Sequence, residues 1–389
     1  MAARKKSNKN TSSNPKPKPK VTAVEVNAAK KQELFDEIVG FLQTKHDISN
    51  IGETQLAEVK QYIPTGADNL DAVLNGGIPC GRIIEIFGEN GTGKSTFAEQ
   101  LMSGNNAIGG FNVLMLSEPV MDKDRMYRIG VKKNRTVIQY PETIEEGFVT
   151  IARYYGQRMS KPELASTPTL IVWDSLSASP SELESKAALE TDSAKAKKIA
   201  NKEGLGPMKR AQFIRSRLSS FAIPLSRANI TLVLVSQVQH GPNSATYGVT
   251  TSRAGGGPAF YSTLRFKTKR LGYYSLEDVE LGIYSIISLV KSKAPGVRPR
   301  SEIPVALNYH NGYDNDESVR NFLNDYYNTP CWTAAAWQKL IDQDGVEHSY
   351  YWKDMQEKLD SIPGVRKYLR DWCFKVIKEN YKKREKKDK

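Results

Sequence analysis

The sequence is poor in the residues that build disulfide or zinc scaffolds. Its 389 residues include three cysteines and four histidines, and Cys80, Cys331 and Cys373 lie far apart. A disulfide framework and a zinc finger are therefore not expected, and we expect a reducing, cytoplasmic compartment. No apolar run approaches the roughly 20 residues that a membrane-spanning helix needs. The first 20 residues are rich in lysine, asparagine, serine and proline, so they do not resemble a secretory signal.

Acidic residues do not balance the basic ones, and the excess lies at the two ends. The net charge is +13, with nine Lys or Arg and one acid in residues 1–31, and eleven and four in residues 364–389. The residues between these ends are therefore slightly acidic. Basic ends attract polyanions such as nucleic acid, because binding releases condensed counterions. Composition leaves a second interpretation open, in which the ends are disordered and only improve solubility.

The N-terminal residues divide into an arm and a helix. Residues 1–27 are predicted to be a disordered basic arm, because Pro-Lys repeats from Pro15 to Lys20 bury too little apolar surface to fold. Apolar residues at helical spacing then predict an amphipathic helix over 28–45, within an N-terminal segment that spans 28–60. The apolar face of this helix packs either on its own chain or on a neighbouring subunit. Its apolar residues include Leu34, Phe35, Ile38, Val39, Phe41 and Leu42.

Short apolar segments alternate with helical patterns from residue 63 to residue 239, which is typical of an α/β fold with a parallel sheet. The expected strands are 83–87, 113–116, 137–139, 170–173 and 231–235. The expected helices between them are 95–107, 122–129, 143–159 and 208–226. Three further strands, at 264–270, 283–292 and 302–307, are expected to extend the same sheet in antiparallel fashion.

The composition changes after Asn311, where aromatic and charged residues become frequent. We therefore predict a core domain over 61–312, a small C-terminal helical α+β domain over 313–380 and a basic tail over 381–389. Most tryptophans of the chain lie in this C-terminal part, and we expect its aromatic residues to form a core rather than to stack on bases. The tryptophans concerned are Trp332, Trp337, Trp352 and Trp372.

The strongest motif lies between the first strand and first helix of the predicted core and matches GxxxxGK[ST] from Gly88 to Ser95. Backbone N–H groups wrap a phosphate only where side chains do not obstruct them, and a helix N-terminus adds partial positive charge. Lys94 would contact the β- and γ-phosphates, and Ser95 would bind magnesium. A chance glycine-rich turn is the alternative. The residues expected at the nucleotide are Gly88, Glu89, Asn90, Gly91, Thr92, Gly93, Lys94, Ser95 and Thr96.

Three other strand ends carry polar residues that fit the same chemistry. Asp174 ends an apolar strand and fits a magnesium ligand, or else caps the next helix. Glu118 follows a strand expected beside strand 83–87, which leads into the phosphate-binding loop (P-loop) Gly88–Ser95. There its carboxylate would activate water, or else it caps the next helix. Gln237 ends a further strand, and its amide would report whether a γ-phosphate is present.

In combination, these elements resemble the RecA family of strand-exchange ATPases, and most of all the phage recombinases of the UvsX type. The resemblance covers roughly residues 60–307 and keeps the order and spacing of every element. It implies a RecA-type P-loop ATPase core, with a mostly parallel twisted sheet flanked by helices and an antiparallel extension. The elements that carry it are Ile63–Asp71, Gly76–Gly88, the P-loop, Glu118, Asp174-Ser175, Gln237, Arg253–Phe260 and Val290–Lys293.

The resemblance implies an ATP-dependent homologous recombinase that forms filaments on single-stranded DNA and exchanges strands with homologous duplex DNA. ATP and Mg²⁺ would lie between adjacent subunits of a homo-oligomer. A single-stranded-DNA-binding protein and a loading mediator are possible partners, and no membrane is expected. Two rival interpretations remain open, namely a ring helicase or ring ATPase with the same core, and a mediator that binds ATP without exchanging strands.

The resemblance also assigns roles to single residues. Glu118 would be the catalytic glutamate, and Gln237 the γ-phosphate sensor that precedes a second DNA-binding loop over 239–258. Lys291 and Lys293 would reach across a subunit interface to the ATP of a neighbour, although alternating lysines on an exposed strand are the plain alternative. The residues expected to contact DNA in the second loop are Arg253, Gly255, Gly256 and Gly257.

Two regions depart from the bacterial pattern. The first DNA-binding loop should lie near 183–208 and carries a longer charged insert, with Lys209 and Arg210 after it as phosphate contacts or as a solvated helix face. At the adenine position, Arg125 stands where RecA and UvsX relatives have tyrosine. A guanidinium plane can also stack on a base. Asp122 would contact the base or the ribose.

Overall fold

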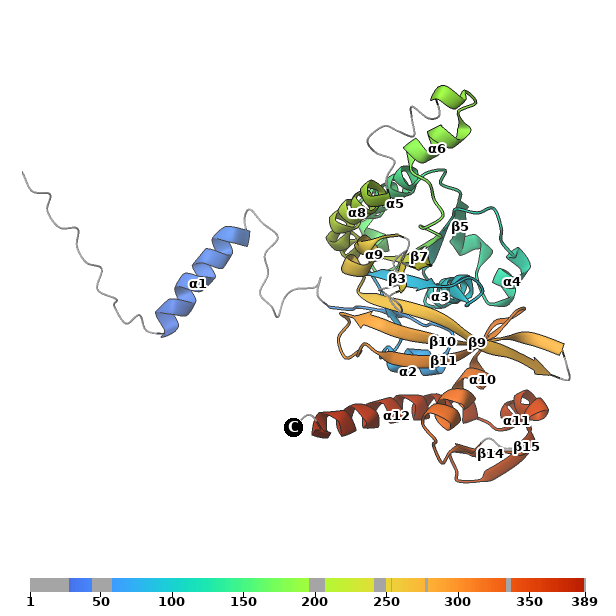
Figure 1. Cartoon of the computed structure of the whole chain (residues 1–389). Coiled ribbons are helices and arrows are strands. Elements are labelled where there is room, and N and C mark those ends of the chain that lie inside the picture. Colours follow the sequence, from blue (N-terminus) through green and yellow to red (C-terminus); the bar gives the residue numbers. More distant parts are fainter. Residues whose placement is uncertain are drawn as a thin grey trace, which may run out of the picture. The chain divides into compact units, whose positions relative to one another are not determined.

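The computed structural model describes residues 28–43, 58–195, 207–240, 250–252, 254–276, 279–333 and 337–387. The chain divides into two units, residues 1–57 and 58–389, which are described separately. In the first unit, α1 (Ala28–Gln43) forms the helix that the apolar spacing predicts (Figure 1). Its side chains Leu34, Phe35, Ile38 and Phe41 are exposed. The arm predicted at 1–27 lies outside the described residues.

The second unit is built on one large mixed sheet (Figure 1). Its strands lie in the order β12-β11-β10-β9-β3-β7-β6-β4-β5, and β8 pairs with β7. This arrangement confirms the predicted α/β core. The strands are β3 (Ile83–Gly88), β4 (Phe111–Leu116), β5 (Thr136–Gln139), β6 (Thr169–Asp174), β7 (Ile230–His240), β8 (Thr250–Ser252), β9 (Leu264–Leu276), β10 (Val279–Ser292), β11 (Ser301–Asn308) and β12 (Gly312–Asp314).

Helices connect these strands and cover the sheet, and a two-stranded pair precedes it. The pair consists of β1 (Tyr62–Ile63) and β2 (Ile78–Pro79). The helices up to β9 are α2 (Asp68–Val73), α3 (Lys94–Ala107), α4 (Lys123–Arg128), α5 (Ile144–Met159), α6 (Glu182–Leu189), α8 (Pro207–Arg227) and α9 (Gly256–Tyr261), with 3-10 turns at Lys133–Arg135 and Pro162–Leu164. Among the described residues, no helix combines the length and apolar character needed to cross a bilayer.

The strands of the core are apolar on both faces because helices cover both faces of the sheet. All six residues of β3 are buried, and five of the six in β6. One apolar cluster gathers side chains of α3, such as Phe97 and Leu101, beneath the sheet. The other cluster gathers Phe148 of α5 and Leu218 of α8 on the opposite face. The predicted strands and helices thus form the two-sided core that their composition requires.

Strand direction corrects two predictions. The strand expected at 264–270 is β9, and it pairs parallel with β3 rather than antiparallel. Antiparallel pairing joins β10 to β9, β11 to β10 and β12 to β11, and also joins the short β8 to β7. The strand that ends before Glu118 is β4, which pairs with β6 and β5, so β7 and β6 separate it from β3. The prediction that it lies beside the P-loop strand is therefore wrong. Local apolar patterns do not encode which strands become neighbours.

The C-terminal residues add a small sheet and further helices. The sheet is antiparallel in the order β13-β14-β15. Trp332 is fully buried, whereas Trp337 is exposed, so these tryptophans do not all serve a core. The elements are α10 (Asn315–Asn321), a π-helical turn (Phe322–Tyr326), β13 (Trp332–Thr333), β14 (Trp337–Ile341), β15 (Glu347–Tyr351), a 3-10 turn (Trp352–Asp354), α11 (Met355–Ser361) and α12 (Val365–Lys387).

The C-terminal helix α12 packs on the core rather than standing apart from it. Arg370 lies 3.4 Å from Asp68 of α2, and Leu369 and Cys373 belong to the same apolar cluster as α2 and α3. The helix continues to Lys387, so the segment predicted as a basic tail is a continuation of α12 in its described part. The domain boundaries given above remain predictions.

Two glycines allow α9 to lie close to α8. A Cβ atom on Gly257 would approach the Arg215 Cα atom to 2.9 Å, and one on Gly255 would approach the Ala211 Cβ atom to 2.7 Å. Gly255 also has φ +80°, a left-handed conformation that favours glycine. By contrast, a Cβ atom on Gly256 would meet no atom within 4 Å. Packing thus explains two of the three glycines that the sequence assigns to DNA.

We expect Gly257→Ala to destabilise the protein and Gly256→Ala to leave it unchanged or slightly more stable. Overpacking against the α8 backbone costs about 1–3 kcal/mol, whereas alanine in an open helical position gains up to about 1 kcal/mol over glycine. Denaturant unfolding of both variants measures the difference. Equal unfolding free energies for the two would contradict the packing role of Gly257.

Candidate nucleotide and interface site

The phosphate loop joins β3 to α3 in the predicted geometry. Gly88 ends β3 in register with Gln237 of β7 on one side and Thr268 of β9 on the other. Gly91 and Gly93 have φ +67° and +88°, and a Cβ atom on Gly93 would meet the Leu307 Cδ1 atom at 2.2 Å. A side chain at position 93 would both strain this turn and collide with Leu307, so the loop requires glycine there. It delivers the chain directly into the N-terminus of α3 at Lys94.

Lys94 is held within this loop. Its Nζ atom donates to the Glu89 carbonyl at 2.6 Å, and the Thr92 hydroxyl donates to the same carbonyl at 2.8 Å. Thr92 Oγ1 also lies 2.7 Å from Thr268 Oγ1 of β9. Burial lowers the pKa of Lys94, against the charges of Asp174 and Glu89. The ammonium is thus positioned inside the loop, where a phosphate oxygen would compete with a single carbonyl for it.

Asp174 ends β6 beside the start of α3. Burial raises the pKa of its carboxyl group, as does nearby Glu118, whereas a hydrogen bond with Ser95 and the charge of Lys94 lower it. The structure thus brings together the two predicted magnesium ligands, Ser95 and Asp174. A hydroxyl and a carboxylate are oxygen donors of the type that Mg²⁺ prefers, so the residues present fit this ion. The peptide bond between Asp174 and Ser175 is cis.

Glu118 and Gln237 lie at the same edge of the sheet as the phosphate loop. Glu118 is exposed two residues after β4, whose Leu116 is in register with Asp174. Gln237 is half-buried, and its backbone N–H donates to the Ser177 hydroxyl at 3.0 Å, which ties β7 to the loop after β6. Residues 241–249 and Arg253 of the predicted second DNA-binding loop lie outside the described residues.

Lys291 and Lys293 are not part of this edge. β10 runs antiparallel, so its Ser285 contacts the phosphate loop, donating to the Thr92 carbonyl at 3.0 Å, while Lys291 pairs with Arg265 near the start of β9. The backbone N–H of Lys293 bonds to Thr263, which in turn bonds to Ile83 at the first residue of β3. The two lysines therefore lie at the opposite edge of the sheet from their own phosphate loop.

Both lysine side chains lie at the carbonyl groups near the C-terminus of α9. Lys291 Nζ donates to the Ala259 and Phe260 carbonyls, both at 2.7 Å, and Lys293 Nζ lies 3.4 Å from the Phe260 carbonyl. Arg215 lies over the Phe260 ring from α8. Burial, together with Lys293 and Arg265, lowers the pKa of Lys291 to about 8. This cationic cluster is joined through α9 to the glycine-rich segment.

Arg125 lines a cavity of about 360 Å³ next to the phosphate loop. Its guanidinium donates to Thr96 Oγ1 at 2.7 Å and forms an ion pair with Glu99 at 2.9 Å, so two α3 residues on one helix face fix its plane. Burial raises the pKa of Glu99 to about 7, against the attraction of Arg125. Asp122 caps α4, accepting from the Arg125 backbone N–H at 2.8 Å.

Sequence reasoning missed Glu99 and the far wall of this cavity. The far wall comes from the ends of β9, β10 and β11, which carry no recognisable motif. Only the three-residue spacing of Thr96 and Glu99 on α3 was available as a signal, and it indicates a shared face, not a partner. The residues of the far wall are Arg270, Tyr273, Glu280, Ile283, Leu307, Asn308 and Tyr309.

Lys209 and Arg210 differ in environment although they are adjacent. Lys209 is exposed, whereas Arg210 turns inward and donates to the carbonyls of Leu176 and Ser177 at 3.1 and 3.0 Å. Arg210 also lies 4.0 Å from Glu184 of α6. The charged insert is helical over α6, where Ser181 and Glu184 form a capping box, and residues 196–206 lie outside the described residues.

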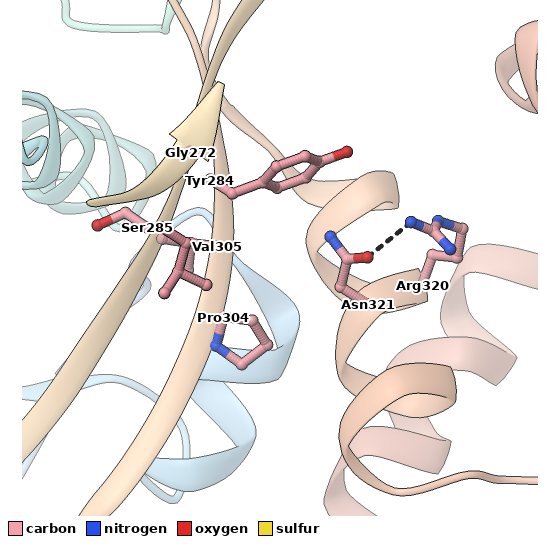
Figure 2. A pocket seen from close by; sticks show the side chains of 8 residues that line it. Gly272, Tyr284, Ser285, Pro304, Val305, Arg320 and Asn321 are labelled. Atoms are coloured by element: carbon pink, nitrogen blue, oxygen red, sulfur yellow. Dashed lines mark hydrogen bonds between the residues drawn. The ribbon is translucent and has the colours of Figure 1, made fainter. Parts of the chain in front are cut away.

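A second cavity, of about 350 Å³, lies between the sheet and α10 (Figure 2). The Tyr284 hydroxyl of β10 donates to buried Glu317 at 2.8 Å, and Arg320 pairs with the same carboxylate at 2.7 Å. Arg320 also donates to Asn321 at 2.6 Å, the contact dashed in Figure 2. These polar groups satisfy one another, so the network joins the C-terminal residues to the sheet.

The geometry agrees with comparisons to known proteins. The model of the RecA N-terminal domain matches residues 41–314. This chain belongs to the RecA family. It is 22% identical to "Protein RecA" of Legionella pneumophila over 329 residues, covering 84% of this chain and 83% of the relative. It is 23% identical to "Protein RecA" of Bordetella pertussis over 343 residues, covering 88% and 86%.

In this RecA-family chain, we expect Arg210→Ala to lower the free energy of unfolding by about 1–3 kcal/mol, because the carbonyls of Leu176 and Ser177 lose a charged donor. Lys209→Ala is the matched control and should stay within about 0.5 kcal/mol of the parent. Denaturant unfolding, with hydrogen exchange at residues 175–178, measures both. Unchanged protection of this loop in the Arg210 variant would contradict the structural role.

Proposed function

We propose that this chain is an ATP-dependent homologous recombinase that forms helical filaments on single-stranded DNA and catalyses strand exchange with homologous duplex DNA. The observation that carries the proposal is the separation of the two halves of the site. Lys94, Asp174 and Glu118 lie at one edge of the sheet, and Lys291 and Lys293 at the other. If both groups act on one nucleotide, the site forms between two subunits in head-to-tail contact, and repeated contacts of this kind build a filament.

Family membership supports the choice of nucleotide. RecA-family proteins are DNA-dependent ATPases that use ATP with magnesium, and the loop from Gly88 to Thr96 suits a triphosphate. Magnesium held by Ser95 and Asp174 would neutralise charge on the β- and γ-phosphates. Lys94 would exchange its bond with the Glu89 carbonyl for phosphate oxygens, and Arg125 would stack on the base.

We assign the reacting groups as follows. Glu118 would take the proton from the attacking water, since it is exposed at the phosphate edge and close enough to Asp174 to raise its pKa. Lys291 and Lys293 of the adjacent subunit would stabilise charge on the transferring phosphoryl group. Gln237 would sense the γ-phosphate and pass its state to the loop that follows β7.

DNA would lie against the two loops. Lys209, which is exposed, fits a phosphate contact better than Arg210, whose guanidinium is engaged with the protein in this conformation. Arg253 and Gly256 remain candidates in the second loop, with Gly255 and Gly257 supporting α9. The basic ends would attract duplex DNA, and α1 would dock on the next subunit. The finer assignments also belong to this proposal: UvsX-type kinship and a viral source, a cytoplasmic location, and single-stranded-DNA-binding and loading partners.

Electron microscopy tests the architecture. The chain, mixed with single-stranded DNA and a non-hydrolysable ATP analogue, should give helical filaments. Closed rings would indicate a ring helicase or ring ATPase, and monomers under these conditions would contradict the proposal. A strand-exchange assay then separates a recombinase from a mediator that binds ATP and DNA alone.

We expect Glu118→Gln to keep ATP and DNA binding but to lower the turnover number at least about 10²-fold, because a positioned base contributes 10²–10⁴. Glu163→Gln, in an exposed 3-10 turn, is the matched control and should turn over ATP like the parent. Steady-state hydrolysis and nucleotide affinity are measured on the same preparations. Parental turnover in the Glu118 variant would remove this residue from its role.

Mixing two inactive variants tests the contribution of the neighbour. The double variant Lys291→Ala, Lys293→Ala lacks one half of the site, and Glu118→Gln lacks the other. In an equimolar mixture, about one junction in four joins two intact halves, so hydrolysis should recover to about a quarter of the parental rate. No recovery in filaments that contain both variants would show that the lysines act within their own subunit or not at all.

A further inference from the structure

The C-terminal sheet presents an aromatic pair to solvent. Trp337 of β14 and Tyr351 of β15 are cross-strand partners, with ring centroids 4.0 Å apart and planes inclined by 34°. Trp337 is 49% exposed and Tyr351 46%. The neighbouring residues Gln338 and Tyr350 are buried on the other face of the sheet, so the pair is not required to cover this small core. Rings of this size at such exposure are typical of binding surfaces.

The pair forms one wall of a groove of about 440 Å³ together with Ser349 and Tyr350, and residues of α11 with the turn before it line the other. Asp354 and Glu357 line this second wall together with Lys358. Asp354 begins α11 but accepts no capping hydrogen bond through its side chain. Within the described residues, neither of these exposed carboxylates forms an ion pair or a hydrogen bond through its side chain. The groove, named here the aromatic groove, thus combines two rings with two available negative charges.

The charges decide against nucleic acid. Single-stranded DNA stacks on exposed rings where a positive surface tracks its phosphates. Here two carboxylates and one lysine line the same groove as the rings, and the nearby Lys339 is already paired with Glu347 at 2.9 Å. The two rings also contact each other, which leaves no space for a base between them. An extended peptide with prolines and positive charges suits both walls better, because proline-rich segments dock in aromatic grooves without losing much conformational entropy.

The chain itself contains such a segment. Residues Pro15–Lys20 alternate proline and lysine. A polyproline II helix has three residues per turn and rises about 3.1 Å per residue, so a proline and the lysine three positions away share one side, about 9 Å apart. In that conformation, each side of the segment would offer one apolar ring and one ammonium group. Proline would pack on Trp337 and Tyr351, and lysine would reach Asp354 or Glu357.

We infer that the aromatic groove binds the proline–lysine segment of a second copy of this chain in an extended conformation. Every subunit then carries both a donor segment and an acceptor groove, as a head-to-tail assembly requires. This contact uses neither the nucleotide residues nor those of the two DNA loops, although it takes its lysines from the basic N-terminal end. It would hold subunits together before those ligands bind, and it can fail without affecting the proposed catalytic role.

A peptide titration tests the groove directly. The full-length chain carrying Pro15→Ala, Pro17→Ala and Pro19→Ala is mixed, without nucleotide or DNA, with a fluorescent peptide of residues 13–21, and anisotropy is recorded. Binding should weaken at least about ten-fold when alanine replaces the prolines of the peptide, because charge is kept but the extended conformation is not. Equal affinity for both peptides would reduce the contact to charge attraction and overturn the inference.

Groove variants locate the binding site. Trp337→Leu and Glu357→Lys, each introduced into the same full-length chain, should weaken peptide binding at least about five-fold. Asp371→Lys, an exposed charge reversal on α12, is the control and should have no such effect. Glu357→Lys guards against misfolding of the tryptophan variant, because it changes a solvent-exposed charge. Parental affinity in Glu357→Lys, or a thymidine oligonucleotide whose binding depends on Trp337, would overturn the inference.

Sedimentation identifies the source of the segment. The unmodified chain should show a mass that rises with protein concentration in the absence of nucleotide, and the triple alanine chain should show less of this rise. Identical masses for the two chains over the whole range would exclude a second copy as the occupant. Because ATP hydrolysis is measured separately, that outcome would leave the proposed recombinase function untouched.

Discussion

Strand direction is the constraint on which the site depends. Parallel strands end at one edge of a sheet, so Gly88, Asp174 and Gln237, which are distant in the sequence, arrive at the same place, and Glu118 follows the strand beside Asp174. Strand β10, which runs antiparallel to β9, reverses this rule. It brings Ser285 to the phosphate loop and carries Lys291 away from it. One change of direction therefore divides the charged groups between two edges, and the proposed function joins them again through a neighbouring subunit.

Burial gives this divided site its electrostatic character. It lowers the pKa of Lys94 and raises that of Asp174, so in both cases it opposes the charged form. A phosphate beside Lys94 and a cation beside Asp174 would reverse both effects, and each would ease the binding of the other. Glu99 and Thr96 hold the Arg125 guanidinium in one orientation. Its plane is therefore already in place for a base, and little side-chain entropy is lost on binding. We therefore expect the site to bind a nucleotide together with its cation more tightly than it binds either one alone.

The sequence predicts single strands, helices and the phosphate loop better than it predicts which of them lie side by side. Apolar runs and the glycine-rich motif locate β3, β6, β7 and α3, because burial and phosphate binding act locally. They do not give the strand order, and the prediction that the strand before Glu118 lies beside β3 is therefore wrong. They also do not give the parallel pairing of β9 with β3. They do not show that Arg210 turns inward or that Gly257 serves packing, since both depend on residues that are distant in the sequence. Trp332 and Trp337 look alike in sequence, yet one is buried and the other exposed.

The C-terminal residues are mechanically part of the core, and this determines what the aromatic groove can do. Leu369 and Cys373 of α12 share an apolar cluster with α2 and α3, and Tyr284 of β10 is bonded to Glu317 of α10. A segment bound in the groove would therefore be attached to the body that carries the phosphate loop, not to a loose appendage. Because the contribution of a second contact grows with its effective concentration, such an attachment would raise the affinity of the proposed head-to-tail interface even if the groove alone bound weakly.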